Sequence, residues 1–274
     1  MTPLEALALH PQREAVLADG VRVSYREAGS APAVTHVLLH GIGSASGSWV
    51  RQLEAAQHKP LRVLAWDAPG YGGSDAVSSD WPRAGDYADR LWAWLDALDV
   101  KTPVTLVGHS LGALMAARAA VQAPQRVQRL VLLAPAAGYG NAEPALREQK
   151  LRDRLTTLER LGPQGMATAR AAAMLSPAAP AELVDAVRDN MAQVIPAGYT
   201  QAARLLAHGT LAADLAQLQC PLAVASGNAD GITTPAACQA VALAGGVAWN
   251  DLGSVGHACP LEAPGPVNAL LGLN

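Results

Sequence analysis

The fold of this chain is decided by VTLVGHSLGA, which occupies residues 104–113. An apolar run leads directly into a Gly-x-Ser-x-Gly motif, and a helical pattern of small residues follows over 113–120. Strand, tight turn and helix are the context in which this motif forms a nucleophile elbow, with Ser110 exposed at the tip of a strained turn. Gly108 and Gly112 let strand and helix pass close together, where a Cβ would clash. The stretch therefore predicts a nucleophilic serine between a strand and a helix.

Length and composition limit the classes of protein to which the chain can belong. Of its 274 residues, 50% are hydrophobic and 16% are charged, so it can bury a large core. A net charge of −3 without a basic run argues against nucleic acid as a partner. The N-terminal apolar run is too short for a signal peptide, and no stretch reaches the roughly 18 apolar residues of a membrane helix. The three cysteines show no metal-ligand spacing, and their odd number argues against a disulfide framework. We therefore expect a cytoplasmic protein without a membrane partner.

Runs of strand length alternate with helical patterns along most of the chain. Residues 14–18 and 21–27 flank Asp19-Gly20, which is a strong hairpin signal. The second of these runs alternates apolar and polar side chains, so one of its faces should be solvated. Most later runs are apolar throughout, which is typical of parallel strands covered on both faces. They occupy 34–39, 61–66, 104–107, 129–134 and 222–226, and a last strand is expected over 247–252.

The alternation stops between residues 138 and 216, where no strand is expected. Helical patterns fill this segment over 144–161, 164–174, 180–195 and 197–206. Ligands of open α/β sheets bind at the carboxyl ends of the strands, so we expect the segment to lie over that edge as a cap. A separate helical domain is the alternative, but the strand rhythm resumes afterwards. The predicted division is a core domain of residues 1–137 and 217–274, with the cap inserted at 138–216.

Three candidate catalytic residues each lie in a loop just after a predicted strand. Ser110 is a poor nucleophile at neutral pH and needs a base, for which His257 is the candidate. Asp230 would hold the imidazole tautomer and stabilise the imidazolium. The loop after Ala134 offers no carboxylate, and Asp251 is the second choice for the acid. The chain order Ser, Asp, His is that of one known arrangement of the catalytic triad.

The glycine-rich loop HGIGS at residues 40–44 predicts an oxyanion hole. The backbone N–H groups of Ile42 and Leu111 would hold the developing negative charge. The histidine of this loop is expected to brace it, and His109 is expected to support the nucleophile rather than to react. Cys259 lies close in sequence to the candidate base, and packing is its expected role rather than a competing thiol.

The motifs HGIGS, DAPGYGGS, GHSLG, GNAD and GHACPLEAP resemble, in this order, those of the α/β-hydrolase superfamily. The likeness covers nearly the whole chain. More narrowly, the chain is similar to small cytosolic esterases, lactonases and carbon–carbon bond hydrolases that act on ring-cleavage products. The resemblance implies a mostly parallel eight-stranded sheet flanked by helices, with an antiparallel second strand and residues 138–216 as the cap. Ring-cleavage hydrolases often carry Asn before the nucleophile and Trp after the histidine, where this chain has His109 and Ala258.

Together these features predict a serine hydrolase that cleaves a carboxylic ester or lactone of a small, mostly apolar substrate through an acyl-enzyme on Ser110. No metal and no organic cofactor are implied. A carbon–carbon bond hydrolase of meta-ring-cleavage products, of the 2-hydroxy-6-oxo-dienoate type, is one alternative. A ligand receptor with a vestigial triad is another. The charged residues of 147–154 are expected to be solvated, although one arginine could turn inward to hold a substrate carboxylate. The sequence is compatible with a homodimer.

Overall fold

The computed structural model describes residues 1–274 and centres on one eight-stranded sheet with the strand order β1-β2-β4-β3-β5-β6-β7-β8. β2 runs antiparallel to β1 and to β4, whereas the other neighbouring pairs are parallel. The predicted sheet, mostly parallel with an antiparallel second strand, is therefore confirmed. The strands are β1 (Arg13–Val16), β2 (Arg22–Gly29), β3 (His36–Leu39), β4 (Arg62–Trp66), β5 (Val104–His109), β6 (Val127–Leu133), β7 (Leu222–Ser226) and β8 (Trp249–Asp251).

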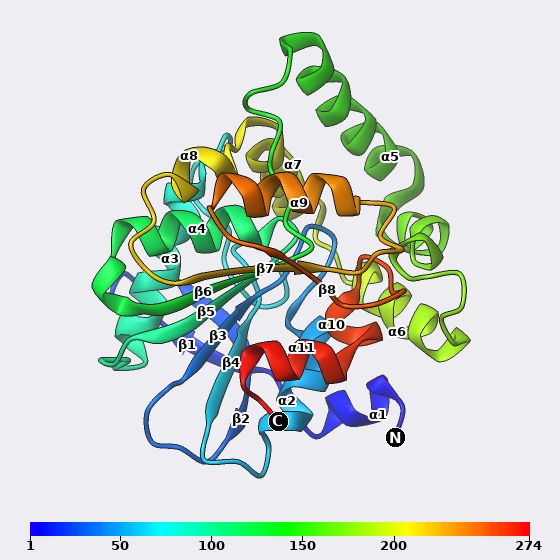
Figure 1. Cartoon of the computed structure of the whole chain (residues 1–274). Helices are drawn as coiled ribbons and strands as arrows, with labels where there is room; N and C mark the ends of the chain where they lie inside the picture. The colour runs from blue at the N-terminus through cyan, green and yellow to red at the C-terminus, as the bar shows by residue number, and fades with distance from the viewer.

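Helices cover both faces of the sheet (Figure 1). One face carries α3 (Ala84–Ala97), α4 (Gly112–Gln122), α8 (Leu211–Leu215) and α9 (Pro235–Ala244). The opposite face carries α2 (Val50–Ala56), α10 (Cys259–Glu262) and α11 (Pro264–Leu271), and α1 (Pro3–Ala8) packs on α2. No helix combines the length and the apolar character that crossing a membrane requires.

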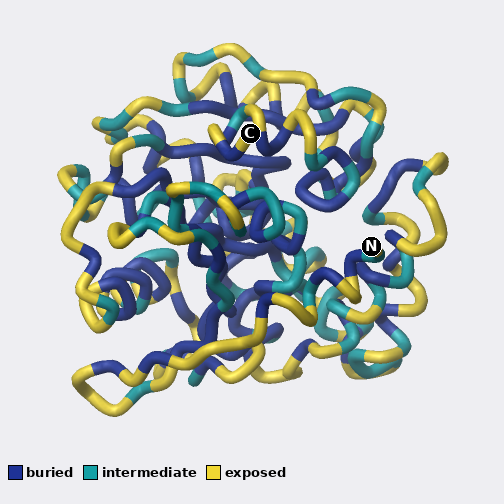
Figure 2. The backbone as a smooth tube through the Cα atoms, turned by 90° about the horizontal axis from the view of Figure 1, so that it is seen from below, coloured by how far each residue is buried: buried dark blue, intermediate teal, exposed yellow.

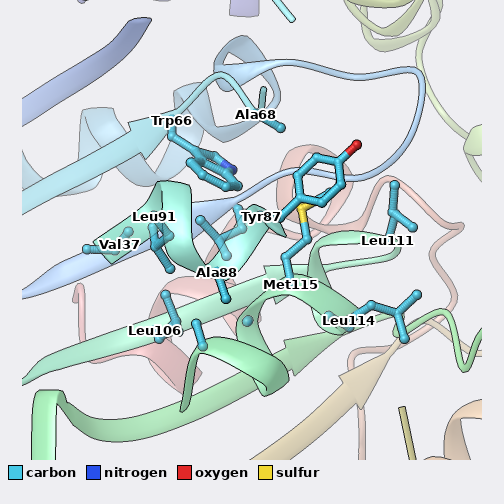
Figure 3. Packing of buried hydrophobic residues seen from close by; sticks show 14 of the residues in the cluster. Val37, Trp66, Ala68, Tyr87, Ala88, Leu91, Leu106, Leu111, Leu114 and Met115 are labelled. Atoms are coloured by element: carbon cyan, nitrogen blue, oxygen red, sulfur yellow. The ribbon is translucent and has the colours of Figure 1, made fainter. Parts of the chain in front are cut away.

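Successive side chains of the central strands enter two different cores. On β6, Leu130 and Leu132 pack toward α3 and α4, whereas Val131 and Leu133 pack toward α2 and α11. Buried residues run through the middle of the molecule, and exposed residues lie mainly on its outer loops and helix surfaces (Figure 2). Figure 3 shows part of the core between the sheet and the helices α3 and α4, where side chains of both helices pack near Trp66. Covering on both faces explains why the parallel strands are apolar throughout.

The hairpin of β1 and β2 forms around Asp19-Gly20 at one edge of the sheet, as predicted. The expectation that the polar residues of β2 form a solvated face is wrong at Ser24, which is only 2% exposed. Its hydroxyl donates to the Asp67 carboxylate over 2.8 Å. The loop after β4 therefore covers this position, and a long-range hydrogen bond takes the place of water.

The segment between β6 and β7 is helical, as expected. It contains α5 (Pro144–Arg170), α6 (Ala181–Ala192), α7 (Pro196–His208) and α8. Within α5, Gly162 has a φ of +63° and precedes Pro163, which has no backbone N–H to continue the helix. This break separates two helical stretches close to the two predicted for 144–161 and 164–174. Figure 1 shows the first stretch of α5 extending away from the sheet.

Candidate active site

Ser110 sits at the sharp turn that connects β5 to α4. Its φ is +53°, a left-handed conformation that is uncommon for a residue with a Cβ. The turn is anchored because the Ser110 N–H donates to the Leu133 carbonyl over 3.0 Å. A Cβ on Gly112 would lie 2.3 Å from the Leu39 carbonyl oxygen, so only glycine fits where the helix starts. The strained elbow thus has the predicted form, but the serine is only 6% exposed and faces a cavity rather than the outer surface.

His257 and Asp230 are brought together by the loops after β8 and β7. The His257 Nδ1 lies 2.8 Å from the Asp230 Oδ2, and both residues are buried. An ionised carboxylate only accepts hydrogen bonds, so Nδ1–H is the donor and Nε2 is left to act as a base. Burial alone would raise the pKa of Asp230. The hydrogen bond and charge of His257, together with the Ile232 N–H and the Thr233 hydroxyl, outweigh burial and hold that pKa below its usual value.

Thr233 is a residue of this site that the sequence analysis did not single out. Its N–H donates to Asp230 Oδ1 over 3.0 Å, and its hydroxyl oxygen lies 2.8 Å from Asp230 Oδ2 and 3.1 Å from His257 Nδ1. The Ile232 N–H adds a further bond of 2.7 Å to Oδ1. An aspartate that accepts from the backbone two residues later is an ordinary Asx turn, so the Asp-Gly-Ile-Thr sequence carried a usable signal.

Ser110 and His257 line the same cavity, which has a volume of about 290 Å³. No hydrogen bond joins the Ser110 Oγ to the His257 ring. The hydrogen-bond partners of this ring, Asp230 and Thr233, lie on its Nδ1 side. The structure therefore pairs the proposed base with the proposed acid and places the serine at the same cavity. Catalytic hydrogen bonds are often long or poorly aligned before substrate binds.

The loop of residues 40–44 lies directly beside the serine. A Cβ on Gly41 would lie 2.8 Å from the Ser110 Cβ and 3.3 Å from its Oγ. The backbone N–H groups of Ile42 and Leu111 donate to no acceptor within the chain. Leu111 is buried, and buried backbone donors are rarely left unpaired, so two free N–H groups beside a strained serine point to an acceptor supplied from outside.

Two buried histidines hold this loop and the elbow in place. The Nδ1–H of His40 donates to the Gly41 carbonyl over 2.8 Å, and its Nε2 accepts the Ala68 N–H over 2.9 Å. The Nε2–H of His109 donates to the His257 carbonyl over 2.8 Å. Burial and the neighbouring His257 lower the pKa of His109 to about 3, so its ring is neutral. Neither ring competes with His257 as the base.

The alternatives for acid and nucleophile lie away from this arrangement. Asp251 is exposed at the end of β8, where it accepts the Asn228 amide over 3.1 Å and the Gly253 N–H over 2.8 Å. It makes no bond to His257. Cys259 is fully buried and does not line the cavity, and burial raises the pKa of its thiol well above the usual value. A protonated thiol is a weak nucleophile.

The helices between β6 and β7 contribute part of the cavity wall. Met191 of α6 and Tyr199 of α7 line it, as do Arg154 and Arg170 of α5. Neither arginine forms an ion pair, and no Asp or Glu side chain lines the cavity. The Arg154 guanidinium lies 5.7 Å from the centre of the Tyr139 ring. The charged residues of 147–154 were expected to be solvated, and an inward arginine among them was only the alternative; Arg154 follows that alternative, whereas Arg170 was not foreseen. No group of His, Cys, Asp and Glu side chains is arranged to hold a metal ion.

Comparison with known proteins gives matches at the level of family and fold. The profile described as "Alpha/beta hydrolase family" matches residues 37–270. A 2-hydroxy-6-oxononadienedioate/2-hydroxy-6-oxononatrienedioate hydrolase of Paraburkholderia xenovorans is 37% identical over 124 residues, which is 44% of this chain and 42% of that protein. An uncharacterised Mycobacterium tuberculosis protein is 41% identical over 114 residues, or 42% of this chain and 32% of that one. The matched stretch thus spans less than half the length of these relatives.

Solved structures resemble this chain over nearly its whole length. An esterase from Thermogutta terrifontis superposes with a TM-score of 0.82 at 22% identity, covering 96% of this chain and 97% of the other. The enol-lactonase from Burkholderia xenovorans superposes with a TM-score of 0.82 at 22% identity, covering 95% and 99%. At such identities the likeness shows the fold.

Proposed function

The chain belongs to the alpha/beta hydrolase family, and from this premise we propose that it cleaves a carboxylic ester or lactone of a small, mostly apolar substrate through an acyl-enzyme on Ser110. The observation that carries the proposal is that three features lie at one cavity or directly beside it. They are a serine with a φ of +53°, an imidazole bonded to a buried carboxylate, and two unpaired backbone N–H groups.

The proposed mechanism uses three side chains and two backbone N–H groups. The Ser110 Oγ attacks the substrate carbonyl while the His257 Nε2 takes its proton, and Asp230 stabilises the imidazolium. The N–H groups of Ile42 and Leu111 receive the oxyanion of the tetrahedral intermediate. His257 then protonates the leaving oxygen, and a water that it activates hydrolyses the acyl-enzyme. Ser110, His257 and Asp230 act as a unit, so losing one of them removes most of the rate.

Residues 138–216 act in this proposal as a cap over the core formed by 1–137 and 217–274. Support comes from the cavity wall, because Met191 and Tyr199 belong to this segment and face the side that carries Ser110. A wall that combines apolar side chains with polar groups suits a small organic substrate. Methionine adapts to substrates of varied shape.

The test is turnover combined with chemical labelling. A panel of p-nitrophenyl esters and lactones should be hydrolysed by the wild type and not by Ser110→Ala, which should keep the same circular dichroism spectrum. A fluorophosphonate should add to Ser110 alone, as read by mass spectrometry of the labelled peptide. Labelling of Cys259, or no labelling with no turnover of any ester, would overturn the proposal and favour a receptor with a vestigial triad.

A second candidate, carbon–carbon bond hydrolysis of a ring-cleavage product, is favoured by Arg154 and Arg170. Two unpaired guanidiniums in a cavity without carboxylates suit a substrate that carries a carboxylate. Relatives of this chain are named as hydrolases of dienedioates, which are dicarboxylates. Turnover of a 2-hydroxy-6-oxo-dienoate exceeding that of every ester and lactone would select this candidate. Its loss in the Arg154→Gln and Arg170→Gln variants, but not in the exposed Arg152→Gln control, would confirm the role of the two arginines.

A further inference from the structure

A second cavity, called here the arginine cavity, lies between the start of α3, the side of α4 and the end of α7. Its volume is about 690 Å³, and it shares no lining residue with the cavity of Ser110. The polar and aromatic side chains that carry the argument are Trp81, Arg83, Arg118, Arg204, His208 and Asp214. α7 contributes to both cavities, because it places Tyr199 in the first and Arg204 in the second.

The side chains that line the arginine cavity carry a net positive charge. Three arginines line it against one carboxylate, Asp214, which is buried and already paired with Arg118. Arg83 and Arg204 form no ion pair. The Nε of Arg204 is buried without a hydrogen-bond partner, although its Nη1 donates to the Asp80 carbonyl over 2.6 Å. Like charges gathered in one hollow repel each other, and a bound anion would relieve that repulsion.

Backbone donors at the start of α3 face the same space. Ala84 and Gly85 line the cavity, and their N–H groups, in the first turn of a helix of 14 residues, have no acceptor in the chain. Helix N-termini favour phosphate because their N–H groups and the helix dipole act together. Arginine adds two parallel donors that match the oxygens of a phosphoryl group.

Trp81 provides a flat apolar surface beside these donors. The indole is 55% exposed, so part of its surface is open to a ligand. The Arg204 guanidinium lies 4.5 Å from the centre of the indole ring, and the His208 ring meets the indole edge-on at 5.6 Å. Burial, with Arg147 and Arg83, lowers the pKa of His208. A planar group can stack on the open side of the indole.

We propose that the arginine cavity is a binding site for a phosphate monoester that carries a flat ring. Arg83, Arg204 and the first N–H groups of α3 hold the phosphoryl group, and Trp81 stacks on the ring. Arg118 stays with Asp214 and borders the site. The volume of the cavity falls within the range of sites for ligands of this size. The proposal does not depend on the chemistry at Ser110.

The test is calorimetric titration of the full chain at low ionic strength, with AMP, inorganic phosphate and adenosine as probes. AMP should bind saturably, phosphate more weakly, and adenosine not measurably. Arg83→Gln and Arg204→Gln should each weaken AMP binding on the order of tenfold, the loss of one charge-assisted contact. Trp81→Ala should weaken AMP but leave phosphate unchanged. The exposed Arg152→Gln variant, which lies outside both cavities, should bind like the wild type.

Two results would overturn the proposal. One is the absence of saturable binding of both AMP and phosphate to the wild type. The other is binding that survives Arg83→Gln and Arg204→Gln but is lost in Arg154→Gln, because the anion would then occupy the cavity of Ser110. Equal affinity for AMP and phosphate, unchanged in Trp81→Ala, would reduce the site to one for free phosphate and refute the role of the ring. Circular dichroism and Tm of each variant separate loss of binding from loss of fold.

Discussion

Asp230 and Asp251 differ in surroundings rather than in chemistry, and this difference supports a prediction at the scale of single residues. Asp230 is buried, bonded to His257 and held by three further donors, whereas Asp251 is exposed and bonded elsewhere. Asp230→Asn should lower kcat on the order of 10⁴-fold, because the amide would hold the wrong imidazole tautomer. Asp251→Asn should leave kcat nearly unchanged. Steady-state kinetics on one p-nitrophenyl ester compares the two, and a larger loss in Asp251→Asn would reverse the assignment.

His109 provides a prediction about stability and pH. Its pKa is about 3 in the folded chain, against an ordinary value of 6.5. The unfolded chain therefore gains a proton as the pH falls through 6.5, while the folded chain does not, so stability decreases over this interval. His109→Asn removes this contribution. The free energy of unfolding of the variant should therefore depend less steeply on pH than that of the wild type, and the two slopes should differ by up to about 1.4 kcal/mol per pH unit.

Urea unfolding between about pH 7 and pH 4 measures that slope. The exposed His58→Asn variant serves as the control and should keep the slope of the wild type. If the free energy of unfolding changed equally with pH in the wild type and in His109→Asn, the folded chain would protonate this ring as readily as the unfolded chain.

Which residues could be foreseen depends on how local their signals are. Ser110, Asp230 and His257 each follow a strand directly, so the rhythm of the chain places them at one edge of the sheet. Ser24 could not be foreseen as buried, because its partner Asp67 is distant in sequence. Arg170 could not be placed either, since the direction of its side chain depends on how α5 packs on its neighbours.

At the scale of elements, the elbow depends on a close approach of α4 to the loop after β3. A Cβ on Gly112 would lie 2.3 Å from the Leu39 carbonyl oxygen and 2.8 Å from that of His40. Backbone atoms cannot turn aside as a side chain can, so Gly112→Ala should cost about 1–3 kcal/mol of stability. It should also lower kcat, because displacing α4 moves the Leu111 N–H.

Gly265→Ala is the matched control for this variant. Gly265 lies in the first turn of α11, and a Cβ there would meet nothing within 4 Å. Its stability and kcat should stay close to those of the wild type. Denaturant unfolding and ester kinetics measure both variants, and equal stability of the two would contradict the close approach.

Elements themselves were predictable where they are long. The strands predicted over 61–66, 104–107, 129–134 and 222–226 lie within a few residues of the observed bounds of β4, β5, β6 and β7. The helices α1, α8 and α10 were missed because they contain 6, 5 and 4 residues, too few for a helical period to appear. Their positions depend on the surfaces that they cover.

At the scale of the whole molecule, the cavity between the sheet edge and the helices of 138–216 is the feature that could be predicted least well from the sequence. The helical patterns of 138–216 predicted a cap over the carboxyl ends of the strands, but not the volume of the cavity or the presence of both of its arginines. Both follow from how the helices pack over the strands, which pairs residues distant in sequence, such as Ser110 and Tyr199. Charge at the cavity is therefore a property of the assembled fold.

The size of that cavity leads to a prediction about substrate length. A volume of about 290 Å³ is at the lower end of the range for ligand sites, and Arg154 and Arg170 line it. A long acyl chain would have to cover these charges with apolar surface, which is unfavourable unless they are paired. We therefore expect kcat/KM to be highest for acetate to hexanoate p-nitrophenyl esters and to fall for laurate and palmitate. Leu206→Ala, which shortens a side chain of the cavity wall, should move the optimum toward longer chains. A kcat/KM that keeps rising to palmitate, or that jumps when the ester forms micelles, would mean that the cavity does not limit the substrate.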